Sequence, residues 1–282
     1  MRIVLKTLLL GFCFITSLSF SGSNTLNENE SMHVFESLDL SIRSISSMQF
    51  TLVNHERIGK RMMKGKQKVS LIPSPFQCYI LMIEPGDGEE LVYAGERYSN
   101  FAIYEPNGFP YIQLELDPKG SLMRKNNHHT IFDLGFGKMM EILKFHMHAS
   151  SYEMSIDELR IDGKDIQKLS IEFTDFSYSK IVIKQKESLS DLADRMMLND
   201  YMLYEINGIG ISDQLKVGSN ILVPSAYAKK IELYIDKASG YPVSQIIFDD
   251  KGLYEKYEYS DLVINSSIPE SRFKSENLGK SL

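Results

Sequence analysis

Four of the six histidines stand in pairs whose chemistry could serve a metal ion: His128 with His129, and His146 with His148. Imidazole nitrogens are common zinc ligands. Adjacent residues of a strand, however, point to opposite sides of it, and two residues that are two apart on a helix do not share a face. The spacing therefore argues against a metal centre, and the sequence predicts neither a metal nor a cofactor.

The other reactive side chains lack the partners that catalysis needs. Cys78 lies in a strand-like run with no adjacent base, which favours a buried core thiol over a nucleophile. Glu56 and Arg57 are interpreted as a surface ion pair. Glu89 and Glu90 follow a turn and are expected to be solvated, although Glu90 could be half-buried. Without a Gly-x-Ser-x-Gly, His-Glu-x-x-His or phosphate-loop motif, the sequence predicts a protein that is not an enzyme.

The N-terminus has the three-part layout of a secretory signal peptide. Arg2 and Lys6 provide positive charge, residues 8–15 form an apolar run, and Ser19-Phe20-Ser21 places small residues two apart. We expect residues 1–21 to be removed and the protein to be periplasmic. The alternative is an uncleaved N-terminal anchor. A lipoprotein signal is disfavoured because Cys13 lies inside the apolar run.

The charge of the chain limits its partners. The formal net charge is −6, and loss of the signal peptide would remove the positive charges of Arg2 and Lys6 and leave −8. No basic block of the kind that follows a phosphate backbone is present, so we predict no nucleic-acid partner. One cysteine, Cys78, remains after cleavage, so the stability of the mature chain must come from packing rather than from an internal disulfide.

The apolar pattern predicts an α+β fold. Spacings of three and four residues indicate helices over 33–45 and 134–148. Short β-like runs separated by turn residues indicate an antiparallel sheet that curls, with helices on one face. The expected strands lie in 48–57, 67–72, 76–83, 90–93, 100–104, 111–116, 158–161, 166–173, 230–236, 243–249 and 252–262.

A different pattern occupies residues 178–225. A β-branched strand over 180–184 leads to Ser188-Leu189-Ser190-Asp191, which has the composition of a helix N-cap. A second short helix is expected to end at Asn207-Gly208, and Asn220–Pro224 forms a return strand. This βααβ order resembles the LysM family, and the resemblance rests also on Leu192-Ala193 and on Leu215-Lys216-Val217-Gly218.

The LysM resemblance implies recognition of peptidoglycan or a related N-acetyl glycan. Two loops at one end would form the site: Lys186, Glu187 and Ser188 in the first, and Gly210, Ile211 and Ser212 in the second. The first loop departs from the family, whose members commonly carry Gly-Asp-Thr there. The alternative is a LysM-like fold that is retained only as an inserted support.

The surrounding residues, 32–177 and 226–273, resemble LolA-like envelope proteins, which hold lipids or lipoproteins in a half-barrel wrapped on helices. The resemblance rests on Ile231–Asp236, Ser239–Val243 and Tyr257–Leu262, while the earlier half resembles a secreted bacterial family of unknown function. It implies either an apolar cavity or an ordinary packed core. The LysM-like module, 178–225, would interrupt this host as an insertion, and 274–282 is predicted to be a flexible tail.

The sequence therefore predicts a non-enzymatic binding protein of the cell envelope. The module would contact peptidoglycan, and the half-barrel would hold a lipid, a lipoprotein or another hydrophobic partner. The alternative is a structural envelope-assembly protein that uses both modules for protein contacts. An enzyme that acts on peptidoglycan ranks last because the chain lacks a catalytic constellation.

Overall fold

The structure is a computed structural model that describes residues 28–109 and 112–280. The predicted signal peptide lies outside the described residues. Within them, no helix combines the length and the apolar character that crossing a membrane would require.

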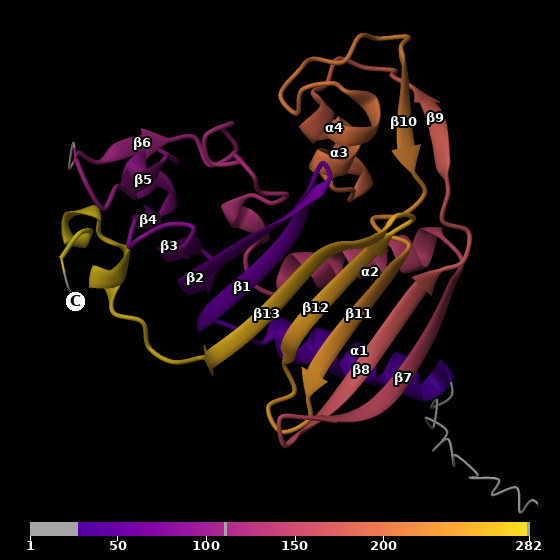
Figure 1. Cartoon of the computed structure of the whole chain (residues 1–282), viewed down its shortest axis with the longest axis horizontal. Coiled ribbons are helices and arrows are strands. Elements are labelled where there is room, and N and C mark those ends of the chain that lie inside the picture. Colours follow the sequence, from indigo (N-terminus) through magenta and orange to yellow (C-terminus); the bar gives the residue numbers. More distant parts are fainter. Residues whose placement is uncertain (1–27, 110–111, 281–282) are drawn as a thin grey trace, which may run out of the picture.

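One antiparallel sheet of eleven strands dominates the molecule and curves around its helices (Figure 1). The strand order across it is β6-β5-β4-β3-β2-β1-β13-β12-β11-β8-β7. The strands are β1 (Met48–Ile58), β2 (Arg61–Pro73), β3 (Phe76–Glu84), β4 (Glu90–Tyr93), β5 (Ala102–Glu105), β6 (Leu114–Leu116), β7 (Tyr152–Ile161), β8 (Lys164–Phe173), β11 (Lys230–Asp236), β12 (Pro242–Asp249) and β13 (Gly252–Ile264). The predicted α+β class, a curved antiparallel sheet with helices on one face, is confirmed.

Alternation of side chains explains why these segments form strands. On β1, Met48, Phe50 and Leu52 are buried in the main core, and each is two residues from the next. The turn to β2 contains Gly59, whose positive φ of 59° suits glycine in a tight turn. β1 and β2 then pair along their whole length, from Met48 opposite Leu71 to Ile58 opposite Arg61.

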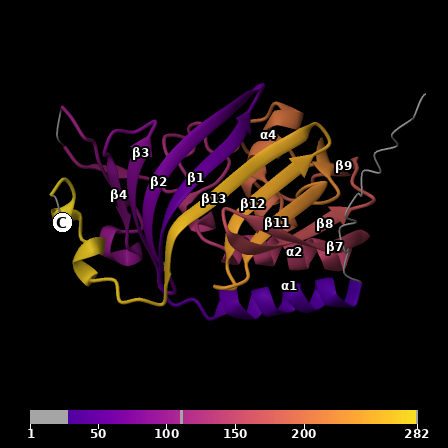
Figure 2. The same ribbon diagram turned by 60° about the horizontal axis from the view of Figure 1, so that its bottom comes forward.

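Two helices cover one face of the sheet, as Figure 2 shows. Helix α1 (Glu28–Arg43) buries Phe35, Leu38 and Ile42, which lie three and four residues apart on one stripe. Helix α2 (Gly137–Ala149) buries its own stripe, which includes Met140 and Leu143. Both stripes belong to the same core as the inward side chains of the strands.

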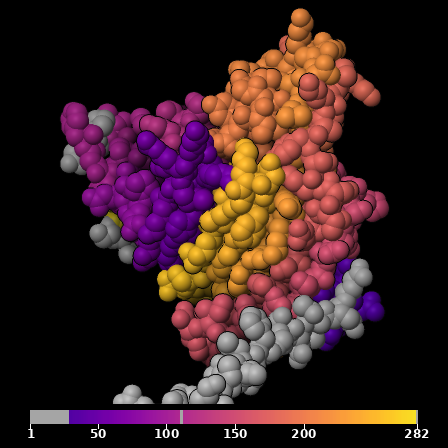
Figure 3. All heavy atoms as spheres, turned by 45° about the vertical axis from the view of Figure 1, so that its right-hand side comes forward, coloured from indigo at the N-terminus to yellow at the C-terminus, as the bar shows by residue number. Residues whose placement is uncertain are grey.

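The segment between β8 and β11 forms a separate lobe, seen at the top of Figure 3. Its elements are β9 (Tyr178–Val182), α3 (Leu189–Met196), α4 (Asp200–Asn207) and β10 (Asn220–Pro224), in the predicted βααβ order. β9 and β10 pair with each other and not with the large sheet. Because β8 and β11 are neighbours in the sheet, the lobe is inserted into a hairpin of the host. We call it the βααβ module.

The end of the chain differs from the prediction of a flexible tail over 274–282. Short 3₁₀ turns at Glu270–Phe273 and Ser275–Asn277 place Phe273 and Leu278 in a buried cluster with Tyr79, Val92 and Ile103. The cluster forms because β3 to β5 have an apolar outer face that water would otherwise contact. The described part of this tail, up to residue 280, is thus packed against the sheet.

Candidate functional site

A cavity of about 590 Å³ lies between the sheet and the segment that leads into α2. Strands β1 to β4, with β12 and β13 beside them, form its floor, and residues 122–142 form much of its cover. Pockets that bind small molecules commonly have volumes of about 300–1,000 Å³. The sequence left open whether this space would be a cavity or a packed core, and the structure shows a cavity.

The lining of this cavity is predominantly apolar. Its floor and cover include Leu52, Ile80, Met82, Leu91, Met139 and Ile142. Its mouth is marked by lining residues that are exposed, among them Lys64 and Lys125. Leu114 and Leu122 also lie at the mouth, where 46% and 73% of their surfaces are exposed and form an apolar rim. An elongated apolar group could therefore enter over an apolar rim and exchange water for hydrocarbon contacts.

One end of the cavity is polar, and its lining residue His129 contacts the carboxylate of Glu255, which is buried beside the cavity. This fully buried side chain lies 2.7 Å from His128 Nδ1 and 3.3 Å from His129 Nε2. Asn199 Nδ2 donates to it at 3.0 Å, and the hydroxyl of Tyr227 donates at 3.2 Å. Buried carboxylates are tolerated when several donors surround them. We call Glu255 and these four partners the Glu255 cluster.

His128 is held on every side. Its ring stacks between Tyr201 and Tyr254, with centroid distances of 4.6 and 4.4 Å. Its Nε2 lies 2.9 Å from the carbonyl oxygen of Arg57, and its backbone N–H donates to Glu56 at 2.7 Å. With so many fixed contacts, His128 is part of the framework of the site rather than a group that can move.

His129 borders the cavity itself, and its charge state is set by its neighbours. Burial alone would lower the pKa of His129, but the negative charge of Glu255 and the hydrogen bond to Asp133 raise it well above its ordinary value. Burial alone would raise the pKa of Glu255, but the positive charge of His129 and the hydrogen bond from His128 lower it to about 2. The geometry thus supports a charged His129–Glu255 pair at the end of the cavity.

Two sequence interpretations fail at this site. Glu56 and Arg57 do not form a surface pair: Glu56 is buried and accepts a hydrogen bond from Tyr257 at 2.8 Å, whereas Arg57 pairs with the buried Asp249. His128 and His129 lie in a loop, not a strand, so the opposite-face argument does not apply to them. Both rings reach Glu255.

A signal for this site was present in the strand periodicity. On β13, Glu255 continues the inward row of Tyr257 and Tyr259, and on β1, Glu56 continues the row of Phe50 and Leu52. β1 and β13 place Glu56 and Glu255 directly opposite each other. A carboxylate at an inward strand position predicts a buried polar partner. The sequence interpretation missed Glu56 because it pairs Glu56 with Arg57 at the surface, and it assigns no role to Glu255.

The two loops predicted to bind glycan do lie side by side. Leu215 N–H donates to the Glu187 carbonyl at 2.8 Å, and Ser190 N–H donates to the Ile211 carbonyl at 3.1 Å. The side chains of Glu187 and Ser188 are, however, used within the module. Glu187 is buried against Arg195 at 2.8 Å, and Ser188 caps α3.

The remaining predicted residues keep groups that could meet a ligand. Lys186 and Ser212 are exposed, and Gly210 and Ile211 are half-buried. The backbone N–H groups of Ile211 and Ser212 have no hydrogen-bond partner among the described residues. An added Cβ at Gly210 would lie 2.8 Å from the carboxyl group of Asp213, which would have to move. The second loop therefore offers two donors beside an aliphatic side chain.

Cys78 is a core residue, as the sequence indicated. It is fully buried, and burial raises the pKa of its thiol to about 12. Such a thiol is neutral and inert at physiological pH. In the part of the chain that the structure describes, no three His, Cys, Asp or Glu side chains are grouped as metal ligands.

These features define a class of protein, one in which an open curved sheet and its helices enclose a largely apolar cavity. The chain belongs to the family described as "Protein of unknown function (DUF1571)", whose model matches residues 45–196. No curated protein matches the sequence.

Solved structures similar to this chain include the MucA/MucB complex of Pseudomonas aeruginosa, with 13% identity, a TM-score of 0.41, and coverage of 87% of this chain and 61% of that chain. A LolA superfamily protein from Nitrosomonas europaea has 12% identity, a TM-score of 0.34, and coverage of 88% and 99%. The lipoprotein LppX of Mycobacterium tuberculosis has 10% identity, a TM-score of 0.42, and coverage of 86% and 99%.

Proposed function

We propose that this chain is an exported, periplasmic, non-enzymatic binding protein whose cavity holds the acyl chain of a lipid or lipoprotein. The cavity of about 590 Å³ carries this proposal. A saturated chain gains about 0.8 kcal/mol for each CH₂ group that leaves water. The apolar lining of the empty cavity is not packed against other protein groups, so the free energy of removing it from water is available to a bound ligand.

The proposal is tested by filling the cavity from within. Leu52→Trp places an indole at a lining position near the centre of β1, and it should weaken the binding of palmitic acid by about tenfold or more because ring and chain compete for the same space. Binding is measured by displacement of N-phenyl-1-naphthylamine, an uncharged fluorescent probe. Val263→Trp, at a position that is 46% exposed and does not line this cavity, is the matched control. Wild-type protein that binds neither probe nor palmitic acid would refute the proposal.

We further infer that the βααβ module is a LysM-like glycan-binding unit that holds the protein on peptidoglycan. The support is the pairing of the two predicted loops and the free N–H groups of Ile211 and Ser212. Such donors suit the carbonyl oxygen of an N-acetyl group, and the side chain of Ile211 suits its methyl group.

Deletion of the module is a poor test, because Met202 and Asn199 of the module are buried against the host. A point change is sharper. Ile211→Asp should lower retention on insoluble peptidoglycan roughly fivefold, since it removes an apolar contact and adds a charge. Val217→Asp makes the same change at a module residue that is 56% exposed and outside the two loops. Equal retention of both variants and the wild type would leave the module as a support only.

A further inference from the structure

Gln245 on β12 carries a side-chain amide that opens on the cavity. Only 3% of its surface is exposed, and it lines the cavity. Among the described residues, no group forms a hydrogen bond with its side chain. A glutamine amide can donate two hydrogen bonds and accept two. Neither amide atom of Gln245 is enclosed by protein, because the side chain opens on the cavity. Its hydrogen-bonding groups are therefore available to a molecule that enters there.

Gln245 is one member of a polar row across the cavity floor. Tyr257 on β13 lies directly opposite Gln245, and Asn54 on β1 lies directly opposite Tyr257. Directly opposed residues of antiparallel strands point to the same face, and all three line the cavity. Gly65 extends the row on β2, where an added Cβ would lie 2.3 Å from Asn54 Oδ1. The glycine thus leaves the space that the Asn54 amide occupies.

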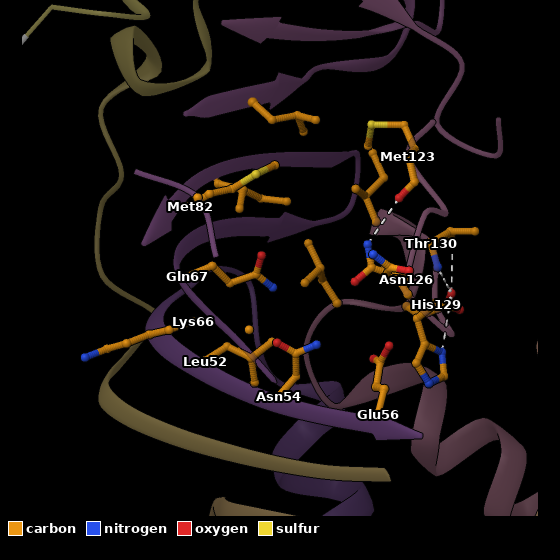
Figure 4. Close-up of a pocket in the computed structure, with 18 of the residues that line it drawn as sticks. Leu52, Asn54, Glu56, Lys66, Gln67, Met82, Met123, Asn126, His129 and Thr130 are labelled. Carbon is orange, nitrogen blue, oxygen red and sulfur yellow. Dashed lines mark hydrogen bonds and ion pairs between the residues drawn. The ribbon is translucent and has the colours of Figure 1, made fainter. Parts of the chain in front are cut away.

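A third amide lies one row along the sheet. Gln67 on β2 is opposite Leu52, and Figure 4 shows the amide groups of Gln67 and Asn54 turned toward the cavity, whereas Lys66 points away. Within the described chain, neither Asn54 nor Gln67 has a side-chain hydrogen bond. Three amides therefore face one apolar space with their hydrogen-bonding capacity free.

The carboxylates at the inner end of the cavity differ from these amides because they already accept hydrogen bonds within the protein. Glu56 accepts hydrogen bonds from His128 N–H and from the hydroxyl of Tyr257. Asp133 accepts from Thr130 N–H at 2.8 Å, and Lys64 at the mouth pairs with Glu84 at 3.1 Å. An anionic head group brought to the inner end would meet the carboxylates of Glu56 and Asp133. The side-chain amides that remain without hydrogen bonds at this end therefore suit an uncharged group that both donates and accepts hydrogen bonds.

We propose that the cavity receives an amphiphile whose acyl chain is joined to its polar part by a carboxamide, and that this amide binds inward against Gln245, with Asn54 and Gln67 beside it. This rests on the proposed acyl-binding function and specifies its ligand class. A carboxamide offers an N–H and a C=O to the side-chain amide of Gln245, whereas an ester of the same size offers only acceptors.

Two probes of equal size separate these possibilities: N-methyldodecanamide and methyl dodecanoate. Their affinities for the wild type and for Gln245→Met are measured by displacement of N-phenyl-1-naphthylamine. Methionine keeps the length of the side chain and removes the amide. The ratio of amide affinity to ester affinity should fall about fivefold or more in Gln245→Met, which corresponds to one net hydrogen bond. Gln77→Met, at a half-buried glutamine of β3 that does not line the cavity, should keep the wild-type ratio.

A stability measurement distinguishes a ligand-binding role from a structural one. Replacing a cavity-lining amide by an apolar side chain removes no hydrogen bond between described residues here, so it should leave the melting temperature of the empty protein unchanged or raise it. If Gln245→Met does not fold, Asn54→Leu tests the same preference at the neighbouring position of the row. An unchanged ratio in a folded variant overturns the amide proposal and leaves acyl binding in place. Failure of the wild type to bind either probe overturns the proposed function itself.

Discussion

Glu255 is the residue at which the parts of the molecule meet. It lies on β13 of the host, and it is contacted by His129 from the cavity wall and by Asn199 from the start of α4 in the module. Burial of an isolated carboxylate would cost several kcal/mol, and the surrounding donors offset that cost. The Glu255 cluster therefore reaches the cavity through His129 and is also part of the contact between host and module.

Replacing His129 by glutamine should flatten the pH dependence of stability on the alkaline side. The folded-state pKa of His129 lies above 6.5, so its contribution is complete below pH 6.5 and is lost as the pH rises through the folded-state pKa. Glu255 acts in the opposite direction. Its pKa falls from 4.5 to about 2, so its contribution is complete above pH 4.5 and is lost as the pH falls toward 2.

Urea unfolding at a series of pH values measures how the free energy of unfolding declines on the acid side and on the alkaline side. Wild-type protein should be most stable between the ordinary values of 4.5 and 6.5. His129→Gln should lose the decline above pH 6.5. An equally steep alkaline decline in the variant would assign the titration to another group.

At the scale of elements, the βααβ module is docked on the host through the start of α4. Arg124 of the host forms a two-pronged pair with Asp200, at 2.5 and 2.9 Å, and only 5% and 12% of these side chains are exposed. Tyr201 stacks on His128, and Met202 enters the main core. The module also has a core of its own around Leu192, so it is a distinct unit with a fixed orientation.

Removing the host side of the ion pair between Arg124 and Asp200 should lower the stability of the protein. Arg124→Met leaves Asp200 buried without its partner, and such changes cost about 3–5 kcal/mol in the free energy of unfolding. Lys119→Met is the matched control. Its pair with Asp194 also joins host and module at 3.2 Å, but both side chains are 58% exposed, which makes it worth less than about 1 kcal/mol. The free energy of unfolding is measured with urea. Similar small decreases in both variants would contradict a host–module contact that depends on Arg124.

For the whole molecule, sequence periodicity is sufficient to predict the curved sheet, both covering helices and the βααβ order, because each depends on local alternation or capping. Helix α3 begins at its cap Ser188, and helix α4 ends at Gly208, as these residue types indicate. The cavity is not predictable in this way, since the apolar residues that line it would equally fill a core. The site at Glu255 depends on contacts between residues far apart in the chain, such as His128 and Glu255. The packed tail around Leu278 likewise depends on an outer-face surface that no local pattern reveals.

The insertion of the module into the β8–β11 hairpin has a consequence for the order of folding. Pairing of β8 with β11 requires residues 174–229 to close as one loop, and the entropy cost of closure increases with loop length. Formation of the β9–β10 pair, from Tyr178 opposite Pro224, brings the ends of that loop together beforehand. In a pulse-labelling hydrogen-exchange experiment, amides of β9 and β10 should thus become protected no later than those of β8 and β11. For the growing sheet, a module that has already folded is equivalent to a short turn.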